Sequence, residues 1–470
     1  MTMTDALAAR LGDIPMQTGE RAVRAKSRDF FWYSPVLKDR LDHVAADAVV
    51  SPRTEAQVMQ VLSACYDLDI PVTPRGGGTG NYGQSMPIAG GVVLDMTGIN
   101  RILAVDQGRI VVEPGALMGD IEDYTRAEYG LEFRMHPSTR ETATIGGFIS
   151  GGSGGVGSIR WGFLADPGNI LRVRMATMEA TPRLIDLTGA DIAKVHHAYG
   201  LTGVMTEVEM PLAPAEDWVE LVVGFDDWGA ALSACWDLAG QDGLLLKQLA
   251  AIEAPAPSRY FKRHAKFIRD NEHVLAILVA PNSLSPLLGL LAAAGGRVAF
   301  NSATASAEDK KGLPHLHHLC WNHTTLRALK TDPEITYLQI GFPDGAVVET
   351  CLKITDRFAG EIINHVEFTR SSGRKRASAL PMVRFSNKTR LDALIAELDA
   401  MGCPNWNPHA YTYEEGNHAD AAADLVALKR DHDPKGLLNP GKLIGWHDPG
   451  YRYDPKGDWA YPGLIEPAAE

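Results

Sequence analysis

The densest group of residues able to bind a ligand is the run Arg75-Gly76-Gly77-Gly78-Thr79-Gly80-Asn81. Consecutive glycines can adopt positive φ and let a ligand approach the backbone without a Cβ clash. Their successive N–H groups can then point into one concavity, which suits the oxygens of a pyrophosphate. A structural turn between two strands is the alternative, but a turn does not need this many glycines. The run therefore predicts a phosphate-binding loop.

Two segments, 78–83 and 152–157, satisfy the pattern GxGxxG. In a Rossmann site a helix follows the glycines directly, because its N-terminus holds the pyrophosphate. The residues after both segments predict no such helix. A nicotinamide dehydrogenase of the Rossmann type is therefore disfavoured.

A second stretch, 135–168, is dense in Gly, Ser and Thr and has no sustained period. Inside a compact domain such a stretch would leave backbone polar groups unpaired unless a ligand satisfied them. The sequence resembles the vanillyl-alcohol-oxidase superfamily. The motifs that carry this resemblance are, in chain order, RGGGTG, VVLDM, HPST, ATIGGFISGGSGGVGSIRWG, GLTGVMTE and the tail DPKGLLNPGK. This superfamily has a PCMH-type FAD domain and includes glycolate oxidase D-subunit-like and D-lactate dehydrogenase proteins.

The resemblance implies an α+β fold, in which a PCMH-type two-lobed FAD-binding domain carries an α+β cap domain for the substrate. It places the loop of residues 75–81 around the FAD pyrophosphate and Val204 against adenine. Asn439 and Lys442 are expected to close the site from the C-terminus. The residues expected along the ribityl and pyrophosphate stretch are Pro137, Ser138, Thr139, Thr144, Gly146, Gly147, Ser150, Gly154, Gly157 and Ile159.

Some relatives attach the flavin covalently to a histidine of the first glycine loop or to a cysteine of the second. The first loop here has no histidine, and no cysteine lies between Cys65 and Cys235. We therefore expect non-covalent FAD, although attachment to a histidine of the cap or C-terminal segment stays open.

Oxidation of an alcohol by a flavin also needs a group that accepts the hydroxyl proton. Histidine suits this task near neutral pH. The candidates are His323, His365 and His409, with Tyr411 as an alternative to a histidine. His323 is favoured, because in an extended segment Trp321 and His323 would face the same side.

Arg374 lies in a basic run after the His365 segment and could clamp a substrate carboxylate, as an arginine fork does. Trp321 and Tyr413 could instead line a site for an uncharged substrate, or simply pack. No catalytic metal is expected, because the HGDGN-like motif of metal-using relatives is missing. The segment with His315, His317 and His318 could chelate an ion, but a solvated loop explains it as well.

The periodicity predicts a helix from Thr54, a hairpin over 101–113 and a helix over 116–129 that Gly130 ends. Segments 170–178, 204–210, 219–225, 274–279, 335–342 and 362–368 read as strands. We divide the chain into an N-terminal arm (1–40), an FAD domain (41–214), a cap (215–415) and a C-terminal segment that returns to the FAD domain (416–470).

The formal charge of −13 disfavours nucleic acid as a partner. Five dispersed cysteines and an N-terminus without an apolar core favour a cytoplasmic protein with reduced thiols. No transmembrane segment is expected, and a homodimer is possible.

The sequence predicts an FAD-dependent oxidoreductase acting on an alcohol or 2-hydroxy acid. The alternatives are an oxidase of an uncharged or aromatic alcohol or sugar, a nicotinamide dehydrogenase, or a non-catalytic flavin-binding protein; the electron acceptor is unspecified.

Overall fold

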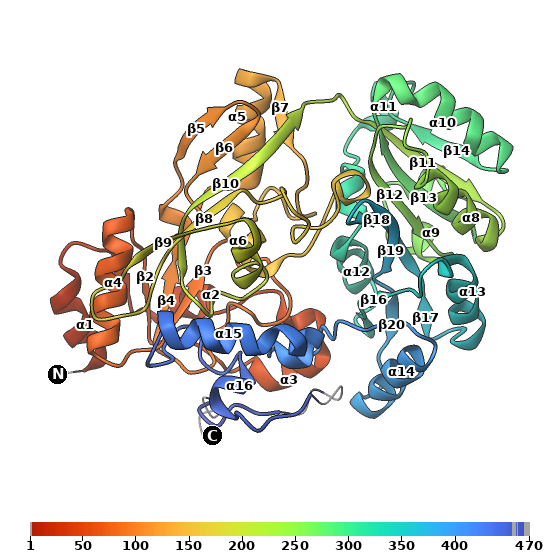
Figure 1. Ribbon diagram of the computed structural model, residues 1–470. Coiled ribbons are helices and arrows are strands. Elements are labelled where there is room, and N and C mark those ends of the chain that lie inside the picture. The colour runs from red at the N-terminus through yellow and green to blue at the C-terminus, as the bar shows by residue number, and fades with distance from the viewer. Residues whose placement is uncertain (1, 454–456, 458, 465–470) are drawn as a thin grey trace. The chain divides into compact units, whose positions relative to one another are not determined.

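The computed structural model describes residues 2–453, 457 and 459–464 of the chain (Figure 1). By its internal contacts the chain divides into two compact units. Unit 1 comprises residues 1–153, 167–214 and 407–470, and unit 2 comprises residues 154–166 and 215–406. Each unit therefore collects segments that lie far apart in the sequence. No helix in the described part of the chain is both long and apolar enough to cross a bilayer.

Unit 1 contains a four-stranded sheet in the order β1-β2-β4-β3, with parallel pairing of β2 to β4 and of β4 to β3. Its strands are β1 (Met16–Gln17), β2 (Ala48–Val50), β3 (Val72–Arg75) and β4 (Val92–Asp95). Helix α4 (Glu55–Asp67) begins where the Thr54 side chain accepts a hydrogen bond from the Gln57 N–H, as predicted, and packs its Val58, Val61, Leu62 face into the core. The glycine run leaves the carboxyl end of β3, the end at which ligands bind in open parallel sheets.

A second sheet of unit 1 is antiparallel. Its order is β5-β6-β10-β8-β9, with β7 paired to the far end of β10, and the strands are β5 (Ile102–Asp106), β6 (Arg109–Val112), β7 (Leu131–Phe133), β8 (Arg172–Ala176), β9 (Leu184–Thr188) and β10 (Val204–Pro214). The predicted hairpin is β5–β6, and the predicted helix is α5 (Met118–Tyr129), which ends at Gly130 with φ of 63°. These two sheets are the two lobes of the predicted fold.

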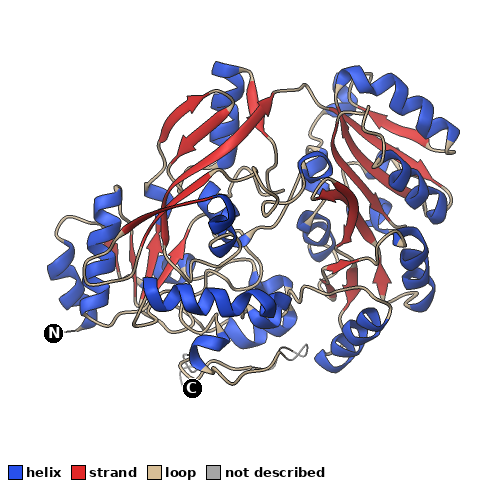
Figure 2. Ribbon diagram, in the orientation of Figure 1, coloured by secondary structure: helices blue, strands red, loops and turns tan. Residues whose placement is uncertain are grey.

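Unit 2 is built on a seven-stranded antiparallel sheet in the order β14-β11-β13-β12-β18-β19-β16. Its strands are β11 (Val219–Phe225), β12 (Leu246–Ile252), β13 (His273–Val279), β14 (Arg297–Asn301), β16 (Ile340–Gly341), β18 (His365–Ser371) and β19 (Arg374–Ala379). Three short strands, β15 (Ile335–Tyr337), β17 (Ile362–Ile363) and β20 (Met382–Arg384), form a smaller sheet. Successive residues of β12 are buried along the whole strand, so both faces of the large sheet are covered at this central strand (Figure 2).

The remaining helical elements of unit 1 are α1 (Met3–Leu11), α2 (Glu20–Lys26), η1 (Phe31–Tyr33), α3 (Pro35–Leu41), η2 (Met96–Gly98), α6 (Ile145–Gly151), η3 (Gly189–Lys194), the π-helical turn η6 (Glu414–His418), α15 (Ala419–His432) and α16 (Ile444–His447). Those of unit 2 are α7 (Ser158–Trp161), α8 (Trp228–Leu238), α9 (Ala256–Tyr260), η4 (Ala265–Phe267), α10 (Pro281–Ala293), α11 (Ala307–Lys310), η5 (Leu316–Leu319), α12 (Asn322–Leu329), α13 (Val347–Arg357) and α14 (Lys388–Ala400). Leu7 and Leu11 of α1 belong to the same core cluster as β2, β3 and β4, so α1 is packed into unit 1.

Three predictions of local structure are wrong. The stretch 135–168 contains two short helices, and α7 follows the second glycine pattern directly. The segment 335–342 splits into β15 and β16, which lie in different sheets, and 362–368 splits into β17 and β18 at Asn364. Asn364 interrupts the strand because its backbone N–H and its side-chain amide both donate hydrogen bonds to the buried Glu253 carboxylate.

The C-terminal segment returns to the four-stranded sheet through a buried ion pair. Lys429 Nζ lies 2.6 Å from Asp433 Oδ2 and also donates to the carbonyl of Leu438, and both charged side chains are almost fully buried. Leu438 forms a parallel bridge with Val72 of β3, the strand that leads into the glycine loop. The pair therefore fixes the chain end against the strand that positions the loop.

We predict that Lys429→Met lowers the free energy of unfolding of unit 1 by about 3–5 kcal/mol, because it leaves the Asp433 carboxylate buried without its cation. Chemical denaturation followed by circular dichroism measures this change. Lys435→Met is the matched control, since Lys435 forms an exposed pair with Asp69 and its loss should change stability little. Equal effects of the two substitutions would contradict this account.

Candidate functional site

The glycine loop is packed so tightly that side chains cannot be added to it. A Cβ on Gly76 would lie 2.0 Å from Thr144 Oγ1, and one on Gly77 would lie 2.1 Å from the carbonyl oxygen of Thr142. Gly78 has φ of 66°, a conformation that disfavours any other residue. Close contact with residues 142–144 therefore requires glycine at positions 76 and 77, and the positive φ favours glycine at position 78.

A pocket of unit 1 lies along this loop and is lined from three sides. Its lining residues are Pro74, Arg75, Gly76, Gly77, Gly78, Thr79, Gly80, Gln84, Ser85, Met96, Pro114, Thr144, Gly146, Gly147, Ser150, Gly151, Tyr199, Gly200, Gly203, Val204 and Met205. They come from the loop after β3, from helix α6 with the residue before it, and from the start of β10. The pocket therefore joins the first glycine run, the second glycine-rich stretch and the predicted adenine strand.

The backbone N–H groups of the loop are positioned to donate hydrogen bonds to a ligand. Among the hydrogen bonds of the described residues, none uses the backbone N–H groups of residues 77–81 as donors. Residues 77–80 are half-buried, and a row of backbone N–H groups beside a pocket fits an anionic ligand. A pyrophosphate of a dinucleotide supplies several oxygens to such a row.

Charged side chains lie directly beneath the loop. The Arg75 guanidinium donates to the Gly76 and Arg28 carbonyls and occupies the space that a Cβ of Gly78 would need. Lys442 Nζ donates to the carbonyl of Gly83, while the buried Asp29 carboxylate accepts from the Phe31 N–H at 2.9 Å. Burial raises the pKa of Asp29 and lowers the pKa of Lys442, and each opposes the shift of the other. A negatively charged ligand in the pocket would favour the protonated form of Lys442.

Tyr199 is a pocket residue that the sequence did not point to. It has φ of 52°, and His197 two residues earlier has φ of 53°, so this short segment holds two strained non-glycine residues. The Tyr199 and His197 backbone N–H groups donate to the carbonyls of Ser150 and Ile149 in α6, which holds the segment in place. Left-handed residues other than glycine carry no sequence signature, so this part of the pocket could not be foreseen.

The structure brings most of the predicted cofactor residues of unit 1 to this pocket, namely Arg75, Gly76, Gly77, Gly78, Thr79, Gly80, Thr144, Gly146, Gly147, Ser150 and Val204. Thr139 lies next to the loop, with its hydroxyl 3.4 Å from that of Thr79, and Pro137 and Ser138 precede it in the same turn. Asn439 donates from its side chain to the carbonyls of Gln84 and Tyr199, and its own Oδ1 is buried without a partner. Asn81 is buried beside the loop but does not line the pocket.

Gly154, Gly157 and Ile159 belong to unit 2. The Gly157 N–H donates to the carbonyl of Lys247 in β12, and Arg370 of β18 donates to the carbonyl of Ile159. The structure therefore shows these three residues as part of the packing of α7 on the large sheet.

Unit 2 contains a buried acid–histidine pair on strand β18. His365 Nε2 lies 2.8 Å from Glu367 Oε1, and both side chains are almost completely buried. The same carboxylate oxygen accepts the backbone N–H of Trp321 at 2.7 Å. Because Nε2 faces the carboxylate, it is assigned the proton, which leaves the lone pair on Nδ1. Nδ1 is buried and has no hydrogen-bond partner within the described residues.

Further buried polar atoms without a hydrogen-bond partner among the described residues lie at the start of α12 and on β18. They are Trp321 Nε1, Asn322 Oδ1 and Thr325 Oγ1 at the start of α12, and Thr369 Oγ1 on β18. Trp321 also has φ of 53°, a strained value for a bulky residue. Buried polar atoms without partners are costly, so these atoms are candidates for contact with a ligand.

The other predicted catalytic and substrate residues have different surroundings. The expected alternation of Trp321 and His323 is wrong, because residues 322–329 form helix α12 and His323 stacks on His318. In unit 1, His409 Nδ1 lies 2.7 Å from Ser34 Oγ, and the hydroxyl of Tyr411 accepts the backbone N–H of Tyr461. Tyr413 packs on Tyr199 within a hydrophobic cluster of unit 1. Arg374 is exposed where β18 turns into β19, opposite Ser371.

Comparison with known proteins agrees with this arrangement. Residues 46–183 match the family described as FAD binding domain. Glycolate oxidase subunit GlcD of Bacillus subtilis is 32% identical over 180 residues, which cover 36% of this chain and 37% of the relative. The mitochondrial D-lactate dehydrogenase (cytochrome) of Arabidopsis thaliana is 31% identical over 175 residues, covering 35% of this chain and 30% of the relative. The chain therefore spans less than two fifths of the length of these relatives.

The whole chain is similar in fold to a solved structure of alkyldihydroxyacetonephosphate synthase. The TM-score is 0.71 at 16% sequence identity, over 94% of this chain and 84% of that one. This similarity confirms the predicted fold class. The matched family confirms the prediction that the cofactor is FAD.

We predict that Gly78→Val abolishes FAD binding while unit 2 stays folded. Valine disfavours φ of 66°, and its Cβ would displace the Arg75 guanidinium beneath the loop. The ratio of flavin absorbance to protein in the purified variant measures this loss. Gly108→Val is the control, because Gly108 has φ of 75° in the β5–β6 turn with open space around it, and this variant should retain FAD. Full flavin occupancy in Gly78→Val would show that the loop is a structural turn only.

We also predict that unit 1 loses stability as the pH falls from 7 towards 4. Burial lowers the pKa of His196 and His418 to about 3 and that of His197 to about 4, from a usual value of 6.5. Below pH 6.5 the unfolded chain therefore binds protons that the folded chain does not, on the order of 1.4 kcal/mol per pH unit for each histidine.

Thermal melting between pH 7.5 and pH 4.5 tests this prediction. His418→Gln removes one of the three groups and should make the fall in melting temperature shallower. His43→Gln, at a histidine of unit 1 outside this cluster, should keep the wild-type slope. A melting temperature of wild type that is constant over this range would refute the prediction.

Proposed function

Because this chain carries a PCMH-type FAD-binding domain and belongs with the FAD-linked oxidoreductases, we propose that it oxidises a 2-hydroxy acid or a related alcohol. Bound FAD would supply the acceptor for the hydride that leaves the substrate carbon. The residues of this chain then have two tasks, which are to hold the cofactor and to take the hydroxyl proton. The glycine loop with Arg75 performs the first task by its N–H groups and its charge.

His365 is the proposed proton acceptor, and the His365–Glu367 pair is the observation that carries the proposal. The Glu367 carboxylate holds the imidazole in one tautomer and would stabilise the imidazolium that forms when Nδ1 takes a proton. Glu367 is itself held by the Trp321 N–H, so the pair is pre-organised. The imidazole has no exposed surface, so a substrate must displace a neighbour to reach it; the strained Trp321 segment adjoins the pair and is the proposed point of entry.

The alternative proton acceptors are less suited to this role. His409 already contacts Ser34 through Nδ1. Burial raises the pKa of Tyr411, which disfavours the phenolate that a tyrosine base needs. His323 lies on helix α12, where its ring stacks on that of His318. His323 is therefore proposed as a secondary group rather than as the base.

The substrate proposal rests on the named relatives and on the polarity of the cluster. Glycolate oxidase and D-lactate dehydrogenase are named for 2-hydroxy acids. Arg374 is not proposed as the carboxylate clamp, because it pairs with Ser371 at the opposite end of β18 from His365, about 20 Å away at the rise of a strand. The second candidate is an uncharged alcohol, which is favoured by the neutral character of the unpartnered atoms of Trp321, Thr325 and Thr369. The two candidates differ in which compounds, 2-hydroxy acids or uncharged alcohols, bleach the flavin under anaerobic conditions.

We predict that His365→Asn retains FAD but slows reduction of the flavin by substrate about 10²–10⁴-fold, the usual contribution of a general base. Anaerobic stopped-flow absorbance measures the rate. His264→Asn is the matched control, because His264 is also buried in unit 2 but makes no contact with a carboxylate like that of His365, and its reduction rate should stay near wild type. A His365 variant that reduces as fast as wild type would refute the assignment of the base.

A further inference from the structure

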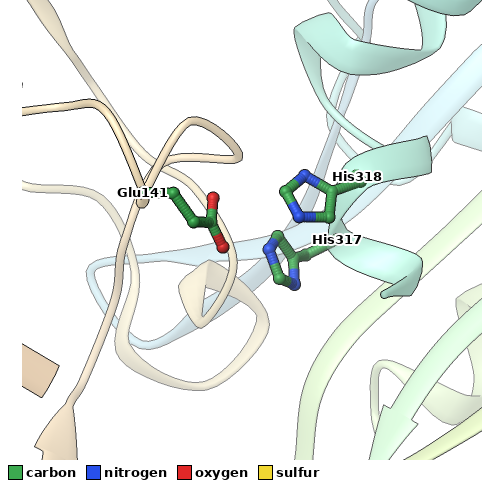
Figure 3. Close-up of side chains that lie close together, drawn as sticks. All are labelled: Glu141, His317 and His318. Carbon is green, nitrogen blue, oxygen red and sulfur yellow. The ribbon is translucent and has the colours of Figure 1, made fainter. Parts of the chain in front are cut away.

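The histidines of η5 do not form a complete metal site among the described residues of unit 2. His317 and His318 lie side by side on this turn, with ring centroids 4.1 Å apart (Figure 3). Leu316 and Leu319 of the same turn are buried in the core, so the turn is not the solvated loop that the sequence allowed. No further His, Cys, Asp or Glu side chain of the described part of unit 2 completes a metal-binding group with the two histidines, and Glu141, also drawn in Figure 3, belongs to unit 1.

In unit 1, residues 28–30 contact the glycine loop that lines the pocket. The Arg75 guanidinium donates to the carbonyl of the first of these residues, and the N–H of the last donates to the carbonyl of Gly80 at 2.7 Å. Between them, the buried Asp29 accepts the backbone N–H of Ser85 through Oδ2 at 3.4 Å. Ser85 lines the pocket, whereas residues 28–30 lie before the segment that matches the FAD-binding family. A segment outside the matched domain therefore supports the wall of the pocket.

Residues near the other end of the chain hold the two positions before Ser85. Lys442 Nζ donates to the carbonyl of Gly83, and Asn439 Nδ2 donates to the carbonyl of Gln84 at 2.7 Å. Both side chains are almost completely buried. Three successive backbone positions, of which the last two line the pocket, are therefore each bonded to a buried side chain from a distant segment.

Asp29 and Lys442 depend on each other for their charges. Burial raises the pKa of Asp29 and lowers the pKa of Lys442, because it disfavours the charged form of each group. The positive charge of Lys442 opposes the rise for Asp29, and the negative charge of Asp29 opposes the fall for Lys442. Arg75 is the other charged group that faces Asp29, and it acts in the same direction as Lys442. Loss of either member of the pair therefore favours the neutral form of the other.

We propose that Asp29 is a positioning residue for FAD, which acts with Lys442 as one charged unit to hold residues 83–85 in the FAD-binding conformation. A carboxylate accepts backbone N–H bonds more strongly than a neutral carboxyl group, and an ammonium group donates more strongly than a neutral amine. Both bonds to the pocket wall are therefore strongest when both groups are charged. The inference rests on the assignment of this pocket to FAD, which Gly78→Val tests separately.

Titration of flavin-free, full-length protein with FAD tests the proposal. We expect Asp29→Asn and Lys442→Gln each to raise the Kd for FAD about tenfold. The double variant should bind FAD within about threefold of either single variant, because the first substitution already favours the neutral form of the remaining partner. Asp42→Asn is the matched control, since this carboxylate pairs with Arg28 of the same segment but is half exposed, and its Kd should change less than about twofold.

The pH dependence of the Kd gives a readout that a purely structural role would not change, and it needs no substitution. Because burial moves both pKa values towards neutral pH, the affinity of wild type should fall towards pH 5.5 as Asp29 gains a proton and towards pH 9 as Lys442 loses one. The double variant should lack both falls, and thermal melting shows whether each flavin-free variant is folded. A wild-type Kd that is constant over this range would overturn the proposal. So would a double variant weakened about 100-fold, or an Asp29→Asn variant that binds FAD as tightly as Asp42→Asn.

Discussion

The backbone N–H groups of residues 77–81 must find acceptors, and the rest of unit 1 is arranged around this requirement. The loop leaves the carboxyl end of β3 and packs against residues 142–144 so closely that only glycine fits at positions 76 and 77. Because of this packing, the loop cannot rearrange to pair these backbone N–H groups with acceptors within the protein. An anionic ligand in the pocket would accept hydrogen bonds from these donors and would thereby stabilise the loop.

Residues that are distant in the sequence contact this loop and the residues next to it. Arg75 fills the space under Gly78, and Lys442, near the end of the chain, donates to the carbonyl of Gly83. The C-terminal segment reaches this position because the Lys429–Asp433 pair and the Leu438 bridge attach it to β3. The pocket is therefore a product of both ends of the chain, although the family match covers only residues 46–183.

Much of unit 1 could be predicted because its signals are local. A run of glycines after a strand, a Gly130 stop and the Asp106-Gln107-Gly108 turn each determine nearby backbone geometry. Tyr199 could not be foreseen, since the positive φ of His197 and Tyr199 is imposed by hydrogen bonds to α6. Helices α6 and α7 were missed because glycine weakens helical propensity, whereas here the small residues allow close packing, as at Gly146 on Pro114.

The acid–histidine pair of unit 2 has a signal in the sequence. His365 and Glu367 are two residues apart in a strand, so their side chains must share one face of the sheet. His323 was favoured instead because an extended backbone was assumed where α12 forms. The start of α12 depends on Trp321 at positive φ and on its N–H bond to Glu367, which are tertiary effects.

The most direct test of the central claim is anaerobic mixing of the purified protein with a panel of 2-hydroxy acids and uncharged alcohols, followed by visible absorbance. The account predicts that the protein is isolated with FAD and that at least one 2-hydroxy acid bleaches the flavin band. A protein isolated with FAD that dithionite bleaches, but that no hydroxy acid or alcohol bleaches, would contradict it.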